Sequence, residues 1–393
     1  MENTSKALLI AAAVLIAILL IVFAIKILKP ATDVEDATKT LGENLDSSKQ
    51  SATKSLALEI NRSSGVGTED ISGQTEAGSQ ESQTLDQGDE AEEKKLVANV
   101  KNKFLNANDN TEVFDEYGNK IVVPAGFCIK TDSGQHVTEG IVICDSRSNE
   151  FVWIPVGTVY KNVEQTQSET ITLGRYDFDA SGNPSAYSSS STEDTKASHD
   201  SAKGNAIAKD IEGFIESAKT NGGYYIGRYE ARTKTPRNSA KDKLTPVTSM
   251  SNDYVYNYIT QPQASEKCQE MYTSSKFTSD LMNSYAWDTA IVFIQVFSGD
   301  TDYSRQTSLN TSFAETGTRG LLVSKQDKIL NIWDMASNCF EWTTQNGFLS
   351  DYYYCCMSVG GGYYSGNHYT SLRSSSTATA GYRHYSFRPI LYI

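Results

Sequence analysis

The chain has 393 residues, a formal net charge of -13 and 39% hydrophobic residues. This length suits one large domain with appended segments. A nucleic-acid partner requires clustered Lys and Arg side chains that displace counterions from phosphates, and the sequence contains no such cluster. The acidic composition therefore excludes nucleic acid as a partner.

An uncharged apolar run occupies residues 7–25, close to the ~20 residues that a helix needs to cross a bilayer. Lys6 precedes the run, and Lys26 follows it. The run is long for the apolar part of a signal peptide, and no small-x-small cleavage pattern follows it. We therefore expect residues 1–30 to be an uncleaved transmembrane anchor, with a pilin-like leader as the open alternative.

Residues 31–95 are rich in Ser, Thr, Gln, Asp and Glu and contain no aromatic residue. Such a segment buries too little apolar surface to offset the entropy of ordering the chain. We expect it to form a polar, acidic stalk that is partly helical or disordered. Charges on the two sides of the anchor roughly balance and do not fix its orientation. We expect the globular part to lie outside the cell.

The composition changes after Leu96, where strand-like runs separated by turn residues begin. Helical spacing of apolar residues follows, first over residues 207–218, before Gly222 and Gly223, and then twice more. These patterns predict an α+β domain over residues 96–393. The expected strands are 120–123, 126–130, 140–144 and 150–156, and the expected helices are 207–218, 264–272 and 285–296.

Four motifs in this domain occur in a fixed order: residues 150–156 (EFVWIPV), 223–231 (GYYIGRYEA), 331–343 (NIWDMASNCFEWT) and 386–391 (SFRPIL). Together they resemble the formylglycine-generating-enzyme, or sulfatase-modifying-factor, family over about residues 97–393. The family usually has Gly where Ser337 stands. The resemblance implies an irregular variant of the C-type lectin fold.

Oxidising members of that family hold copper with two Cys residues, since Cu(I) prefers thiolates. By the resemblance, those positions are Gly366 and Ser371, and neither supplies a thiolate. Cys355 and Cys356 lie nearby, but adjacent side chains on a strand point to opposite faces. Four scattered His residues offer no iron-binding spacing. We therefore expect no enzymatic activity, and a metal-dependent oxidase of this family remains the alternative.

Two further sites follow from residue chemistry. Related domains hold Ca²⁺ near the 331–343 motif, and Asn338 and Glu341 offer the oxygen ligands that this cation accepts. Calcium is therefore a candidate cofactor, the alternative being that both residues bond to loop backbone. Cys128 and Cys144 border an expected hairpin and could be cross-linked in an extracellular domain, although six Cys do not fix a connectivity.

The C-terminal segment 351–388 is rich in Tyr and Ser and lacks Lys, Glu and Gln. Tyr supplies contact area at low entropic cost, and small polar residues supply adaptable hydrogen bonds. The segment also resembles the variable region of proteins diversified by retroelements, whose adenine-derived codons often exclude those three residues. We expect it to bind a protein or glycan ligand on a cell or phage surface, with a pilin-like structural protein as an alternative. The candidate contact residues are Tyr363, Tyr364, Asn367, His368, Tyr369, Ser371, Tyr382, His384 and Tyr385.

Overall fold

The computed structural model describes residues 95–307, 327–347, 354–363 and 367–393. All of them belong to the unit Asp89–Ile393. The predicted anchor, the predicted stalk up to residue 94 and Tyr364 lie outside the described residues. In the part of the chain that is described, no helix has the length and apolar character needed to span a membrane.

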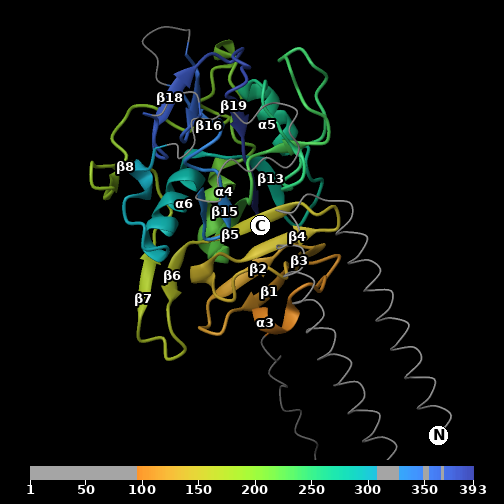
Figure 1. Cartoon of the computed structure of the whole chain (residues 1–393), viewed down its shortest axis with the longest axis vertical. Coiled ribbons are helices and arrows are strands. Elements are labelled where there is room, and N and C mark those ends of the chain that lie inside the picture. The colour runs from red at the N-terminus through yellow and green to blue at the C-terminus, as the bar shows by residue number, and fades with distance from the viewer. Residues whose placement is uncertain (1–94, 308–326, 348–353, 364–366) are drawn as a thin grey trace, which may run out of the picture. The chain divides into compact units, whose positions relative to one another are not determined.

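A six-stranded antiparallel sheet forms the centre of the domain (Figure 1). Three of the four strands expected from the sequence before residue 157 lie in it, and the fourth pairs in an N-terminal hairpin. The sheet brings together strands from both ends of the domain. In spatial order its strands are β13 (Thr278–Leu281), β20 (Pro389–Tyr392), β10 (Gly223–Gly227), β5 (Glu150–Pro155), β4 (Val142–Asp145) and β3 (Phe127–Ile129).

Both faces of this sheet are buried. Successive side chains of a strand point to opposite faces, so Trp153 of β5 enters one hydrophobic cluster while Ile154 enters the other. Along β10, Tyr225 and Ile226 divide in the same way. Burial on both sides explains why these strands read as continuous apolar runs without polar alternation.

A four-stranded sheet carries the C-terminal motifs. Its strands, in spatial order, are β18 (Arg373–Ser376), β17 (Cys356–Val359), β16 (Phe340–Asn346) and β19 (Tyr385–Phe387). The pair β16 and β19 is parallel. Two-stranded hairpins complete the sheet structure: β1 (Thr111–Phe114) with β2 (Lys120–Val123), β6 (Gly157–Tyr160) with β7 (Ser168–Ile171), β8 (Tyr176–Phe178) with β9 (Pro184–Ala186), β11 (Arg232–Thr233) with β12 (Tyr254–Val255), and β14 (Lys328–Ile329) with β15 (Ile332–Trp333).

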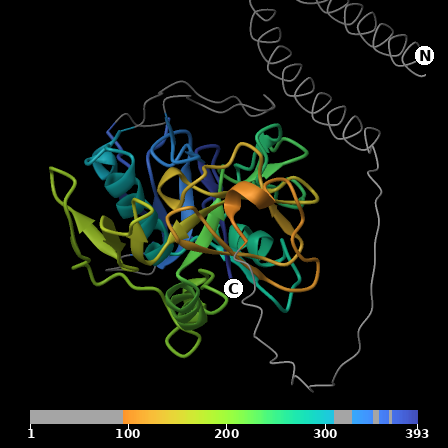
Figure 2. The same ribbon diagram turned by 90° about the horizontal axis from the view of Figure 1, so that it is seen from below.

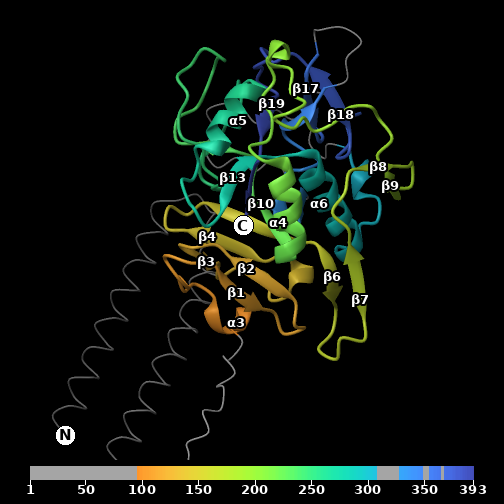
Figure 3. The same ribbon diagram turned by 180° about the vertical axis from the view of Figure 1, so that it is seen from behind.

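Three longer helices pack on the sheets, and α4 and α6 contribute to the same hydrophobic cluster (Figure 3). The first helix was expected to begin at residue 207, but it begins four residues later. Asp210 is extended, and its carboxylate accepts a hydrogen bond from the amide of Gly213, which starts the helix there. The helices are α3 (Val97–Val100), α4 (Ile211–Asn221), α5 (Gln261–Gln269) and α6 (Ser284–Phe297), with 3₁₀ turns η1 (Val137–Glu139), η2 (Ser201–Lys203) and η3 (Tyr303–Arg305).

These elements make a mixed α+β domain dominated by sheet, which confirms the predicted class. The short helix α3 lies at the lower end of the domain in Figure 1, and β16, β18 and β19 lie at its upper end. The N-terminal entry to the domain is thus far from the four-stranded sheet.

Candidate ligand-binding surface

Arg388 joins the motifs that the sequence singled out. Its guanidinium is fully buried and donates to both carboxylate oxygens of Glu341, at 3.0 and 2.6 Å. It also donates to the backbone carbonyls of Gly227, at 2.8 Å, and Trp333, at 2.9 Å. The bidentate pair with Glu341 and the two bonds to backbone carbonyls give the buried guanidinium the acceptors that a buried charge requires. One side chain therefore links three of the four motifs, those at residues 223–231, 331–343 and 386–391, and we call this arrangement the frame.

More buried carboxylates surround the frame. Glu230, Asp327 and Asp334 have no exposed side-chain surface. Burial raises the pKa of Asp334 to about 7, and the nearby charge of Asp327 adds to the effect. Burial also raises the pKa of Glu230 well above its ordinary value, with the charge of Glu341 as the next cause. Part of this cluster is accordingly protonated at neutral pH.

The predicted calcium ligands are partly paired with other residues, and the carbonyl oxygen Oδ1 of Asn338 is buried without a hydrogen-bond partner among the described residues. Both oxygens of Glu341 are taken by Arg388, and the side-chain amide nitrogen of Asn338 donates to Glu230. Within the described residues, no group of three or more His, Cys, Asp or Glu side chains is arranged to hold a metal ion. Asn338 and Glu341 therefore pair with Glu230 and Arg388, and the calcium site stays a prediction.

An aromatic row lies on the surface next to the frame. We use this name for His368, Phe340, His384 and Tyr382, whose consecutive ring centroids are separated by 4.8, 5.9 and 5.6 Å. Phe340 is buried and forms the floor, the two His rings are half-buried, and Tyr382 is 57% exposed. Burial lowers the pKa of His368 and of His384, so both rings are neutral at pH 7.

Main-chain atoms hold residues 382–384 in place. The carbonyl of Tyr382 accepts from the amide of Tyr258 at 3.2 Å, and the carbonyl of His384 accepts from the amide of Phe340 at 2.9 Å. The side chain of Asn257 donates to the carbonyl of Arg383 at 2.9 Å. Because these bonds use the backbone of residues 382–384, they do not depend on which side chains those positions carry.

Of the remaining candidates, Asn367 is exposed and Tyr369 is half-buried beneath the guanidinium of Arg305, 3.8 Å from the ring centroid. Tyr363, Ser371 and Tyr385 are buried, so the prediction of ligand contact stays untested for them and they are not part of the exposed surface. Their side chains face the interior: Tyr363 packs with Val255 and Cys339, Ser371 donates to the carbonyl of Ser304 at 2.9 Å, and Tyr385 stacks on Trp342 with ring centroids 4.2 Å apart.

Tyr385→Ala is expected to reduce the free energy of unfolding by about 3 kcal/mol, because it removes a buried aromatic side chain from the stack on Trp342. Tyr382→Ala should change it by less than about 0.5 kcal/mol, because Tyr382 is 57% exposed. Urea unfolding of both variants measures the difference. Equal losses of unfolding free energy in the two variants would contradict the assignment of Tyr385 to the interior and of Tyr382 to the surface.

Cys355 and Cys356 were expected to point to opposite faces of a strand, but the structure brings their sulfurs close together. Cys355 precedes β17, so strand alternation does not separate it from Cys356, and the two sulfurs lie 3.6 Å apart. Both thiols are buried, and burial raises the pKa of Cys356 well above its ordinary value. A buried thiol of high pKa is a poor thiolate donor at neutral pH.

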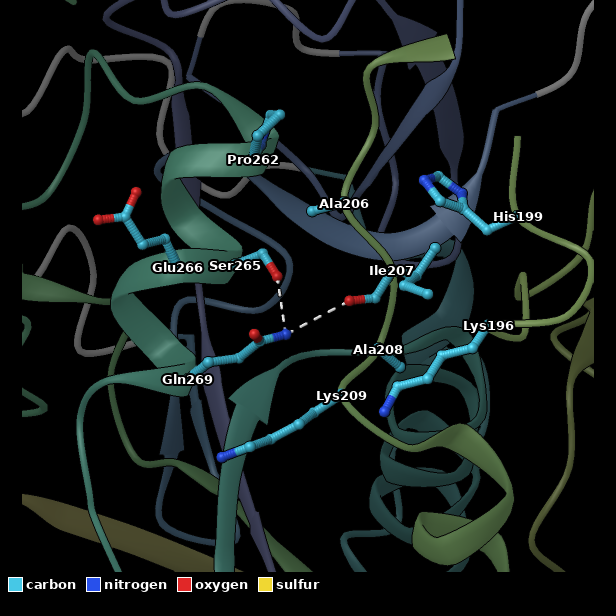
Figure 4. A pocket seen from close by; sticks show the side chains of 10 residues that line it. All are labelled: Lys196, His199, Ala206, Ile207, Ala208, Lys209, Pro262, Ser265, Glu266 and Gln269. Carbon is cyan, nitrogen blue, oxygen red and sulfur yellow. Dashed lines mark hydrogen bonds between the residues drawn. The ribbon is translucent and has the colours of Figure 1, made fainter. Parts of the chain in front are cut away.

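A cavity of 490 Å³ lies between α5 and the segment before α4 (Figure 4). The side-chain amide of Gln269 donates to the carbonyl of Ile207 and the hydroxyl of Ser265, which ties the two walls together. Lys196 and Lys209 line it, but acidic side chains line an adjoining cavity that shares both lysines. This mixed charge favours no single class of ligand. The adjoining acids are Asp194, Asp210 and Glu212.

No family model matches the chain, and no curated protein matches it. The crystal structure of CarF aligns with 62% of the chain and 98% of its own length, at 16% identity and a TM-score of 0.27. A superposition of this quality carries no argument about fold or function. The properties of the surface therefore follow from its own residues.

Proposed function

We propose that this chain is a membrane-anchored protein whose extracellular domain, a C-type-lectin-like domain of the formylglycine-generating-enzyme type, binds a ligand without catalysis. Residues 7–25 form its anchor and residues 31–95 its stalk. The aromatic row and Asn367 contact the ligand, which is a protein or glycan on a cell or phage surface. Segment 351–388 is a target of retroelement diversification in this proposal.

One observation carries the proposal. Residues 382–384 lie on the surface and are fixed through their carbonyl groups, while a buried frame lies beneath them. Preorganised aromatic groups on a rigid support lose little entropy when they bind. Rings that are neutral at pH 7 also desolvate at lower cost than charged groups. The surface thus suits recognition through contact area and hydrogen bonds.

Binding is expected to fall at least tenfold in Tyr382→Ala and in His384→Ala, because each variant removes one ring from the aromatic row. The measurement is binding of the labelled full chain, in detergent micelles, to a printed array of glycans and purified surface proteins. Phe104→Ala is the matched control, since Phe104 is 56% exposed and Tyr382 57%. Equal binding by all four proteins would contradict the proposed surface.

Diversification is tested separately in the DNA. The proposal expects a reverse-transcriptase gene beside this gene, together with a near-copy of its 3′ end that differs mainly at adenines. Sequencing of the flanking DNA gives the answer. A gene that lacks both features would refute diversification. The proposed binding surface would still be tested by the array experiment.

A further inference from the structure

Cys128 and Cys144 face each other across two neighbouring strands. They are directly opposite in the antiparallel register of β3 and β4, and their sulfurs lie 2.9 Å apart as free thiols. Opposite residues of such a pair have Cα atoms roughly 4.5 or 5.5 Å apart, and both separations lie within the range that a disulfide accepts, about 4.4–6.8 Å. No backbone movement is needed to join them.

The other described thiols offer no comparable pair. Cys355 and Cys356 are neighbours in sequence, so a bond between them would close only a small ring and link no separate elements. Cys268 and Cys339 are buried. Cys144 is the more accessible member of the facing pair, because it is only half-buried while Cys128 is 2% exposed.

We propose that Cys128 and Cys144 form a cross-strand disulfide through exchange with a small-molecule disulfide such as oxidised glutathione. The Cys144 thiolate attacks the small disulfide and displaces one of its thiols, which leaves a mixed disulfide on Cys144. The Cys128 thiolate then attacks the Cys144 sulfur and displaces the second small thiol. Two S–H bonds of the protein are lost, one protein disulfide forms, and the small disulfide is reduced to two thiols.

The environment makes this exchange slow at neutral pH. Burial raises the pKa of Cys144 well above its ordinary value, and the neighbouring Cys128 thiol and the charge of Glu150 raise it further, while Lys130 opposes them. The thiolate is the attacking species, so the exchange accelerates as pH rises. The redox state of the compartment sets the equilibrium, so the pair is reduced in a thiol-rich compartment and oxidised outside it.

The position of the bond gives it a mechanical role, which rests on the proposed N-terminal anchor. The described chain enters the domain at Lys95 and α3, in the orange part of Figure 2, and soon meets β3. Residues 101 and 104 form bridges to Ile129 and Cys128. Since β3 is the edge strand of the six-stranded sheet, tension carried through these two bridges would act on β3. The disulfide transfers that tension to β4, which is paired on both sides.

The test uses the full chain in detergent micelles, incubated at pH 8.5 with oxidised and reduced glutathione. Free thiols are then alkylated, and the peptides are identified by mass spectrometry without reduction. We expect one linked peptide pair containing Cys128 and Cys144, with the other four Cys residues alkylated. Alkylation of both Cys128 and Cys144, or linkage of either one to another Cys, would overturn the proposal.

Variants separate the bond from general effects on folding. Cys268→Ser should retain the linked peptide, whereas Cys128→Ser should give no linked peptide and leave Cys144 either as its mixed disulfide with glutathione or alkylated. Reduction should lower the Tm of the oxidised protein by about 5 °C and leave the Tm of the Cys128→Ser/Cys144→Ser double variant unchanged. An equal Tm before and after reduction would remove the stabilising role. None of these readouts involves a ligand, so they are independent of the array experiment.

Discussion

Arg388→Met is expected to reduce the free energy of unfolding by about 3–5 kcal/mol, the usual cost of breaking a buried ion pair from one side. The substitution leaves Glu341 buried without its partner and removes the donors that reach Gly227 and Trp333. The loss is large because burial already disfavours the charged form of Glu341, and Arg388 opposes that effect. Urea unfolding of the full chain, followed by tryptophan fluorescence, measures it.

Two comparisons make the experiment specific to the pair. The double variant Arg388→Met/Glu341→Gln removes both charges and should recover part of the loss, because no uncompensated ion remains. Arg383→Met is the control for loss of a positive charge, since Arg383 is exposed, and it should change stability by less than about 0.5 kcal/mol. A loss below 1 kcal/mol in Arg388→Met would show that the frame is not held by this side chain.

Stability is expected to fall as pH rises through about 4 to 7, because several buried carboxyl groups have raised pKa values. Burial raises the pKa of Asp334 to about 7, and the pKa values of Glu193 and Asp280 to about 6. The folded state therefore holds protons that the unfolded state releases. The stabilisation is complete below the unfolded pKa, near 3.8 for Asp, and is lost as pH rises through the folded pKa.

Asp334→Asn isolates the contribution of one group to this pH dependence. A pKa of about 7 in place of 3.8 corresponds to at most about 4 kcal/mol between the two ends of the pH range. The variant should flatten the curve of unfolding free energy against pH by up to that amount. Asp109→Asn is the control for loss of a carboxylate at an exposed position. A wild-type curve that rises between pH 5 and pH 8 would refute the assignment.

The sequence predicts three of the six strands of the large sheet, namely β3, β4 and β5. Its central strands are apolar, bounded by turn residues and too short for helices, and the structure places strands at each expected run. Helix ends are harder, because a single capping side chain decides them. The apolar spacing predicts a helix from residue 207, but the carboxylate of Asp210 captures the amide of Gly213 and fixes the start at Ile211.

The candidate site depends on contacts that lie far apart in the chain. The sequence presents Glu341 as a carboxylate without a partner, and only the structure shows that Arg388, forty-seven residues later, binds both of its oxygens. Tyr382 and Tyr385 look alike in a polar context, and only the pairing of β19 with β16 places Tyr385 on Trp342. The period of a strand would have separated them: Tyr385 shares a face with Phe387, which belongs to the core.

The carbonyl bonds that fix residues 382–384 have a consequence for evolution. Since these bonds are the same whatever amino acid is present, substitutions there alter the chemistry of the face without removing a contact that the interior needs. At these positions the sequence can change without affecting the ability of the domain to fold. Variants at residues 382–384 can therefore be selected for what they bind, because the fold of the domain does not depend on their side chains.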